Sequence, residues 1–413
     1  MKILNNSLRI ISLMSVAAIL LFTTSCNKEM EQFPDAVVTP VTGPTLDQVL
    51  QSNADDSLYY RMIVRGGQLG LINSAANSYT MFVPNNNGMK AFINAASGGL
   101  VPMMAPNFIF SAFISNSLPA ASAAALVQYN TIPQVIRSGS ISNAFPNFFY
   151  PSALNPMPAA NPFLRLDVYP STRNGAWLNN IPMTGLDQSA SNGVIHHVYT
   201  LAVPAQNYLW DRISTASDLT YLKAAIERAD SGVVASSSLQ GYLSMFGPNF
   251  TVFAPTDSAF KVTLTGLIAQ GLIAQGVPAQ VALGMAGQLA STPAVFTNPL
   301  LAGTLTPQNV KGIVVYHLLG SRAFTNNFPT TETAYPTLLN SGVPSHPGLK
   351  LKAIFGVASP FVAAATVKDV YNNSPAANII INASPLTPDP NGTSDQQYIN
   401  GVLHKIDRVL LPQ

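Results

Sequence analysis

The stretch that decides the fold lies at residues 400–412, which read NGVLHKIDRVLLP. Asn400 and Gly401 are typical of a tight turn, and the apolar residues after them predict a strand. Residues 192–204 read NGVIHHVYTLAVP, which is a second copy of the same pattern. Both copies place a proline twelve positions after the asparagine. The chain therefore contains an internal repeat, and its 413 residues are enough for two domains.

A second pair of related stretches precedes these two. Residues 250–260 read FTVFAPTDSAF, an alternating run that ends at a proline and predicts a strand. Thr256 and Asp257 then suit the cap of a helix that starts near Ser258. The first copy reads YTMFVP at residues 79–84, but residues 85–87 are all asparagine where the second copy has its Thr-Asp cap.

The periodicity of apolar residues predicts further elements. Helical spacing at Leu46–Ile63 and at Leu209–Ala229 predicts an opening helix before each first stretch. Alternating runs at 164–169 and 378–382 predict short strands. The apolar region 262–303 is interrupted by glutamines, so it predicts a pair of packed helices and not a membrane span. Its alanine and glycine content leaves an interaction face as the alternative.

The paired stretches resemble the signatures of the fasciclin domain family, and residues 314–319, VVYHLL, contain a pair that looks like its Tyr-His motif. The resemblance implies an α+β fold with two tandem fasciclin-like domains at 45–204 and 205–413, each a β-wedge or sandwich flanked by helices. The first copy departs from the family pattern, because Asn130 stands in place of the motif histidine.

The motif pair Tyr316 and His317 has two interpretations. In the family this region has been linked to receptor-mediated adhesion, which makes both residues candidate binding residues. Their neighbours are all apolar, which favours a buried strand and a structural role.

The first 44 residues carry the features of an exported lipoprotein. Lys2 and Arg9 are basic, and a short apolar run follows and leads to TTSC at residues 23–26, which resembles a lipobox. The resemblance implies removal of residues 1–25 and acylation of Cys26, the only cysteine in the chain. Residues 26–44 then form an extended, lipidated tether.

The residues after Cys26 predict where the protein is located. One lysine and two acidic residues lie within 27–31, which looks like the signal that exports some Gram-negative lipoproteins to the outer face of the outer membrane. We therefore expect a lipid-anchored, surface-exposed protein, with a periplasm-facing location as the alternative.

The charge and the cysteine content argue against one class of partner and one source of stability. Removal of Lys2 and Arg9 from the 20 basic residues leaves 18 against 18 acidic residues. A neutral protein without a basic stripe has little with which to neutralise phosphates, so we expect no nucleic-acid partner. A lone cysteine also excludes internal disulfides.

No recognisable catalytic or metal signature occurs. The five histidines, at 196, 197, 317, 346 and 404, lack ligand spacing, and His196 and His404 take equivalent places on apolar strand faces, which favours structural roles. Residues 389–395 resemble a calcium loop only in part, and a turn explains them more simply. We therefore expect no metal or other cofactor.

An aromatic stretch supplies the candidate binding surface. Residues 145–163 combine Phe145, Phe148, Phe149, Tyr150 and Phe163 with five prolines and no charge. Proline disfavours regular structure, and exposed aromatic rings can stack on sugars or contact a protein. The alternative is that the rings attach a long loop to its own domain.

The sequence thus predicts a non-enzymatic cell-envelope lipoprotein that acts in adhesion or binds an extracellular protein or polysaccharide. One alternative is an accessory glycan-binding lipoprotein of a nutrient-uptake complex. Another is a hydrolase that uses carboxylates such as Asp167 and Asp187. The sequence leaves the oligomeric state open.

Overall fold

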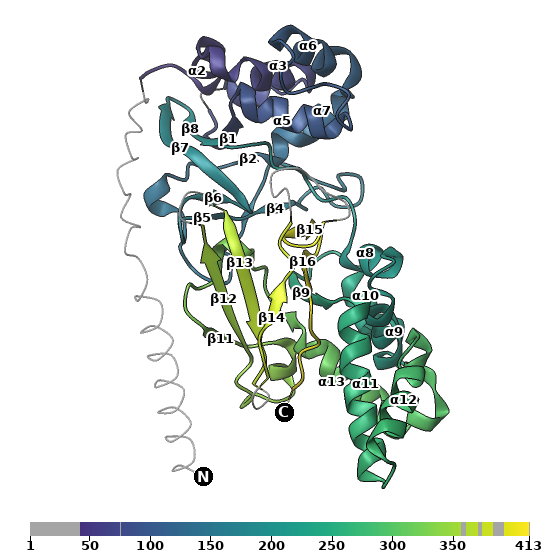
Figure 1. Cartoon of the computed structure of the whole chain (residues 1–413). Helices are drawn as coiled ribbons and strands as arrows, with labels where there is room; N and C mark the ends of the chain where they lie inside the picture. The colour runs from purple at the N-terminus through teal and green to yellow at the C-terminus, as the bar shows by residue number, and fades with distance from the viewer. Residues whose placement is uncertain (1–41, 75, 357–360, 371–373, 383–391, 413) are drawn as a thin grey trace, which may run out of the picture. The chain divides into compact units, whose positions relative to one another are not determined.

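The computed structural model describes residues 42–74, 76–356, 361–370, 374–382 and 392–412. Residues Gly43–Gln413 form one compact unit that contains both copies of the repeat. Figure 1 shows the helices of each copy gathered along one side of its sheet. The fold is α+β, as the resemblance implied.

The first repeat combines six α-helices with a sheet of strand order β2-β1-β8-β7-β6-β5. Its helices are α2 (Leu46–Ser52), α3 (Ser57–Arg65), α4 (Leu69–Ile72), α5 (Asn86–Ala96), α6 (Asn107–Ala112) and α7 (Ala120–Tyr129). Its sheet strands are β1 (Tyr79–Pro84), β2 (Thr131–Ile132), β5 (Pro170–Ser171), β6 (Trp177–Leu178), β7 (Ile181–Ala190) and β8 (Gly193–Val198), and β3 (Tyr150–Pro151) pairs separately with β4 (Asp167–Val168).

The second repeat has the same plan, with strand order β10-β9-β16-β14-β13-β12-β11 and β15 paired with β16. Its helices are α8 (Leu209–Thr215), α9 (Thr220–Ala229), α10 (Leu239–Leu243), α11 (Asp257–Ala274), α12 (Ala279–Leu289) and α13 (Pro307–Tyr316). Its strands are β9 (Phe250–Pro255), β10 (Leu318–Leu319), β11 (Thr333–Tyr335), β12 (Leu349–Phe355), β13 (Val362–Lys368), β14 (Ala377–Ile379), β15 (Gln396–Tyr398) and β16 (Gly401–Ile406).

The two signature stretches of each repeat pair with one another as parallel strands. β1 pairs with β8, and β9 pairs with β16. The register is equivalent, because Phe82 lies opposite His196 and Phe253 lies opposite His404. Each closing strand follows a two-residue turn, but the turn lies one residue earlier than the Asn-Gly pair predicted, because the asparagine is its second residue and the glycine begins the strand.

Both faces of these paired strands are buried. Met81 and Val83 belong to the core shared with the helices, whereas Phe82 between them belongs to a second core formed by strands and loops. Val252 and Ala254 face the helices in the same way, and Phe253 faces the opposite core. A strand buried on both faces reads as a continuous apolar run, which explains the composition of the first stretches.

The geometry that the two repeats share includes the asparagine that precedes each closing strand. The Asn192 side chain accepts a hydrogen bond from the backbone N–H of Leu46 at 2.7 Å, and Asn400 accepts one from Leu209 at 3.0 Å. Leu46 and Leu209 are the first residues of α2 and α8. Each asparagine therefore joins the end of its repeat to the first helix of the same repeat.

The helix after the first stretch is capped in both repeats. Thr256 accepts from the N–H of Ala259, as the Thr-Asp pair predicted, and Asn85 accepts from Gly88 at the equivalent helix. Asp257 then accepts from the N–H of Tyr221, and Asn86 accepts from that of Leu58. The asparagines of the first copy thus reproduce the contacts of the Thr-Asp pair.

Some predicted elements differ from the structure. The buried strand predicted around the Tyr-His motif, over residues 313–319, is correct only for Leu318–Leu319, which form β10. Residues 313–316 belong instead to helix α13, which ends at Tyr316. Each opening helix is broken in two, because extended residues at Asn53 and Ala216 end α2 and α8. The strand predicted at 164–169 is reduced to β4.

The apolar region 262–303 forms the predicted pair of packed helices, α11 and α12. Among the described residues, no single helix is long and apolar enough to cross a membrane. One pair, Asn107–Ser117 with Ala120–Tyr129, meets that test by length and composition but is bent by 110°.

We expect Gly401→Ala to destabilise the second repeat. An added Cβ would lie 2.4 Å from the carbonyl oxygen of Phe250 and 2.6 Å from Leu209 Cδ1, so the strands of the parallel pair must separate, at a cost of about 1–3 kcal/mol. Denaturant unfolding measures this loss. Gly284→Ala in α12 is the control, because nothing lies within 4 Å of its Cβ position, and it should stabilise by up to about 1 kcal/mol. An unchanged free energy of unfolding for Gly401→Ala contradicts the close approach.

Candidate functional site

The structure places Tyr316 and His317 in the interior of the second repeat. The Tyr316 hydroxyl donates to the carbonyl of Gly348 at 2.9 Å, and its burial raises the pKa of the phenol. His317 Nδ1 lies 2.8 Å from the carbonyl oxygen of Ile313, and Nε2 accepts from the N–H of Leu410 at 2.9 Å. These contacts hold the end of α13 against the closing segment, and at 2% exposure His317 has almost no surface to offer a partner.

In the first repeat, Asn130 makes the bonds that His317 makes in the second. Its amide nitrogen donates to the carbonyl of Leu126, four residues earlier, at 2.9 Å. Its side-chain oxygen accepts from the N–H of Ala202 at 3.2 Å. Ala202 follows Asn192 by ten residues, as Leu410 follows Asn400. The position that departs from the family motif therefore keeps the structural function of the histidine.

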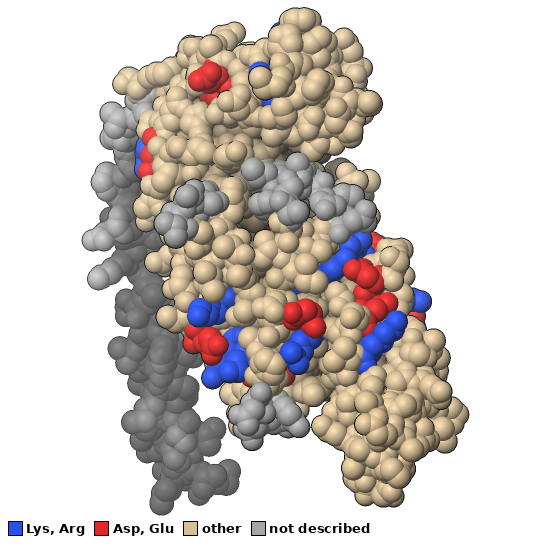
Figure 2. All heavy atoms as spheres, in the orientation of Figure 1, with Lys and Arg blue, Asp and Glu red and all other residues tan. Residues whose placement is uncertain are grey.

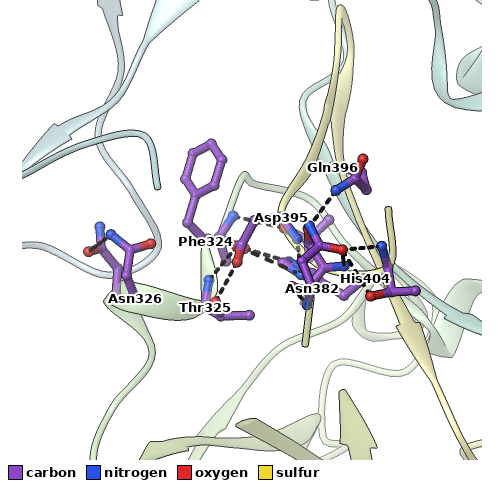
Figure 3. Close-up of polar contacts among 12 residues, drawn as sticks. Phe324, Thr325, Asn326, Asn382, Asp395, Gln396 and His404 are labelled. Carbon is purple, nitrogen blue, oxygen red and sulfur yellow. Dashed lines mark hydrogen bonds and ion pairs between the residues drawn. The ribbon is translucent and has the colours of Figure 1, made fainter. Parts of the chain in front are cut away.

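His196 and His404 lie in a second shared network. Nε2 of His404 lies 2.9 Å from the carbonyl oxygen of Ala323, and Nδ1 accepts from the N–H of Asp395 at 3.1 Å (Figure 3). His196 makes the same two contacts with Ile136 and Asp187. Because one ring nitrogen faces an acceptor and the other a donor, each imidazole is neutral, and burial lowers the pKa of both.

The aspartates beside these histidines have equivalent structural contacts. Asp395 accepts from the backbone N–H of Thr325 at 2.8 Å, and Asp187 accepts from that of Ser138 at 2.8 Å. Each carboxylate also accepts from the hydroxyl of the same residue. Residues 389–391 of the calcium-like stretch 389–395 lie outside the described residues. Within the described ranges no group of three or more His, Cys, Asp or Glu residues could hold a metal ion.

Phe145 and Asn147 attach the aromatic loop to the second repeat. The Phe145 ring contacts those of Tyr335 and Phe328 edge-on, with centroids 4.5 and 5.6 Å apart. Asn147 donates its N–H to the carbonyl of Arg322 at 3.0 Å, and its side chain accepts from the N–H of Phe324 at 3.1 Å. These two residues therefore hold the start of the loop in place.

The next three residues, Phe148, Phe149 and Tyr150, form what we name the aromatic cluster. The rings of Phe148 and Phe149 stack with centroids 5.6 Å apart, and Tyr150 meets Phe148 edge-on at 5.3 Å. The two phenylalanines remain 52% and 48% exposed. Phe163 is 87% exposed, and no ring contact joins it to the cluster among the described interactions. The structure thus separates Phe145, which packs, from an aromatic cluster that faces solvent.

Arg322 is a residue that the sequence analysis missed. Its guanidinium lies over the ring of Tyr169 at 4.8 Å and donates to the side chain of Asn249 at 2.8 Å. It also donates to the carbonyl of Tyr398 at 3.0 Å. The cation–π contact with Tyr169 joins the two repeats, whereas the two hydrogen bonds lie within the second repeat. No local pattern predicts these contacts, because a single arginine in the sequence has no recognisable partner.

A cavity of about 40 Å³ lies beside Arg322. Asp167 lines it, and burial raises the pKa of that carboxyl although the nearby Arg322 opposes the shift. A cavity of this volume is large enough for water, but its volume is far smaller than the several hundred Å³ of a typical ligand pocket. Asp187, the other carboxylate considered for a hydrolase, belongs to the separate network with Ser138.

We expect the stability of the protein to fall as the pH is lowered from about 6.5 to about 4. Burial lowers the pKa of His317 from 6.5 to about 4, so the folded state favours neutral imidazole. Its contribution is complete above pH 6.5 and is lost as the unfolded state takes up a proton, by about 3 kcal/mol in all. Denaturant unfolding at a series of pH values measures this loss.

The control for the pH experiment is His317→Asn, which installs the side chain found at Asn130. We expect this variant to fold and to lose less stability between pH 6.5 and 4 than the wild type, although the smaller side chain lowers its stability at neutral pH. His196 and His404 remain and keep part of the dependence. An identical pH dependence in both proteins contradicts the assignment to His317.

Comparisons with known proteins agree with the repeated geometry. A profile of the Fasciclin domain matches residues 57–204 and 231–412. No curated protein matches the chain. Among solved structures, the chain is similar to that titled "Novel Fold Revealed by the Structure of a FAS1 Domain Pair from the Insect Cell Adhesion Molecule Fasciclin I", with 12% identity, 86% of this chain and 95% of that chain covered, and a TM-score of 0.32. Since the profile spans most of the sequence in two regions, the chain belongs to the fasciclin domain family, with two domains in tandem.

Proposed function

We propose that this protein is a non-enzymatic lipoprotein of the cell envelope that binds an extracellular partner through its fasciclin domains. Fasciclin domains are associated with adhesion or binding. The lipobox-like residues 23–26 support anchoring through Cys26, which lies outside the described residues. Residues 27–31 support placement on the outer face of the outer membrane.

The aromatic cluster is the observation that carries the binding proposal. Exposed aromatic rings offer a large apolar contact area with few rotatable bonds, so little conformational freedom is lost on binding. The contacts of Phe145 and Asn147 hold the loop before the cluster, which reduces that loss further. By contrast, Tyr316 and His317 are buried, so the binding surface that we propose does not include them.

A polysaccharide is the second candidate partner, because uncharged aromatic rings suit contact with sugars. Ring faces can stack on the apolar faces of sugars, and residues 145–163 carry no charge that a neutral glycan would have to desolvate. In this alternative the protein captures glycan for a nutrient-uptake complex. A protein partner and a glycan would use the same side chains.

We expect the double variant Phe148→Ala/Phe149→Ala to bind the partner at least ten-fold more weakly than the wild type, because two half-exposed rings would be lost from the contact. Affinity electrophoresis against a panel of polysaccharides measures glycan capture, and adhesion to immobilised matrix proteins and cells measures the adhesive function. Phe163→Ala is the matched control, since it removes an exposed ring outside the cluster.

Three outcomes of these assays are informative. Loss of binding in the double variant alone supports the aromatic cluster. Equal loss in Phe163→Ala, or full binding by the double variant, assigns binding to another surface. No binding of the wild type to any polysaccharide, matrix protein or cell contradicts the proposed function itself.

We expect Cys26→Ser to abolish acylation, because the thiol that carries the lipid would be missing. Metabolic labelling with a clickable palmitate analogue should mark the wild type and leave the variant unlabelled. Protease treatment of intact cells then separates a surface location from a periplasm-facing one. Labelling of the variant contradicts acylation at Cys26.

A further inference from the structure

The helix pair of residues 257–289, which we name the α11–α12 hairpin, lies from residue 262 onward in a long segment without charge. Residues 262–310 contain no Asp, Glu, Lys or Arg, a run of 49 residues. Figure 2 shows the corresponding lobe free of the red and blue atoms that mark other parts of the same face. A segment of this length without a charged side chain is unusual for a surface in water, where about a quarter of residues are charged.

Helix α12 is unusually exposed for such a segment. It packs on α11 through two fully buried alanines, Ala282 and Ala286, and most of its remaining residues face outward. Val281 and Leu283 are each 53% exposed, and Ile273 near the end of α11 is exposed as well. An uncharged helix that is apolar around most of its circumference is normally covered by other apolar groups.

The base of the hairpin borders an open groove of about 300 Å³. Its lining has no charged residue and is formed by Met285, Gln288, Leu289, Thr292, Ala294, Val295, Asn298 and Leu300. The side chains of Met285 and Leu300 are themselves exposed. Apolar surface therefore continues from the tip of the hairpin to its base.

The first repeat has the same property at the equivalent place, between the capped helix and the Tyr-Asn pair. Residues 91–136 are free of charge for 46 positions. Several apolar side chains in this segment are exposed, namely Leu100, Met103, Met104, Phe108 and Ile109. The absence of charge is thus a property of this position in both repeats, although only the second repeat presents it on a long helix pair.

The chemistry of the hairpin fits lipid better than it fits another protein. Protein interfaces usually have polar rims whose charges select the partner and its orientation, and residues 262–289 of the hairpin carry no charge. A bilayer disfavours charge and accepts a helix, whose backbone polar groups are already paired. The glutamines of the hairpin can remain in the headgroup layer while Ile273, Val281 and Leu283 enter the acyl boundary.

The predicted tether would keep the folded unit close to a membrane. The 17 residues from Cys26 to Thr42 span at most about 60 Å when fully extended. This step depends on the proposed acylation of Cys26. The contact between hairpin and lipid does not, because it arises from the folded domain.

We propose that the tip of the α11–α12 hairpin inserts into the interfacial layer of a lipid bilayer as a second, reversible membrane contact. The proposed lipid on Cys26 would hold only the N-terminal end of the chain, so a second contact would hold the folded unit against the surface. The contact is apolar, so it should depend little on lipid charge or salt.

The test uses the soluble chain from Gln32 to Gln413, which retains the whole compact unit Gly43–Gln413 and lacks Cys26. We expect it to float with phosphatidylcholine vesicles, equally with vesicles that contain phosphatidylglycerol, and equally at low and high salt. Ile273→Asp/Val281→Asp should reduce the bound fraction at least ten-fold, because each substitution places a charge in the acyl boundary. Val234→Asp is the matched control, since Val234 is exposed outside the hairpin.

The other outcomes overturn the proposal. Absence of flotation, binding only to anionic vesicles, or equal loss in Val234→Asp excludes insertion of the hairpin. A dimer in analytical ultracentrifugation that Ile273→Asp/Val281→Asp dissociates, without flotation of the wild type, assigns the hairpin to a second copy of the chain. Circular dichroism verifies that each variant is folded. Phe148→Ala/Phe149→Ala should float normally, so failure of the proposed function is distinguishable from failure of this inference.

Discussion

The close parallel pairing of the first and last strands of each repeat is the constraint on which the rest of the structure depends. Tyr79 lies opposite Gly193, and Phe250 lies opposite Gly401, so chain segments more than a hundred residues apart meet at backbone distance. Glycine is required at this approach, because a Cβ would lie less than 2.5 Å from the facing carbonyl oxygen in both repeats. The asparagine before each glycine then accepts a hydrogen bond from the first helix of its repeat. The buried histidine three residues after the glycine contacts a carbonyl of the adjacent loop.

The repeats preserve this arrangement with different side chains. Asn130 and His317 both join a carbonyl four residues earlier to a backbone N–H of the closing segment. Asn86 and Asp257 likewise bond the N–H of a preceding helix. What is retained is one donor and one acceptor at a fixed place, which an amide supplies as well as an imidazole. A sequence motif can therefore degenerate while its hydrogen bonds persist, and the amide version does not titrate.

The interior and the surface have different functions in this protein. His196, His404 and the Tyr-His pair are buried in core contacts, whereas the aromatic cluster and the α11–α12 hairpin carry exposed apolar side chains. The two surfaces differ in chemistry, since rigid stacked rings suit a shaped partner and an uncharged helix pair suits a fluid apolar layer. A lipoprotein that binds at one surface and contacts its membrane at the other would use both.

Local sequence was sufficient for features that depend on neighbouring residues. The two strand stretches, the presence of a turn before each closing strand, the cap at Thr256 and the helix pair near 262–303 follow from spacing and side-chain type. The helical position of Tyr316, the match of Asn130 to His317, the contacts of Arg322 and the division of the aromatic loop did not follow. Each depends on residues distant in the chain, which supply the missing donor, acceptor or ring only once the strands have paired. The physical reason is that burial and hydrogen-bond satisfaction belong to contacts in space, and a residue's own neighbours along the chain do not specify them.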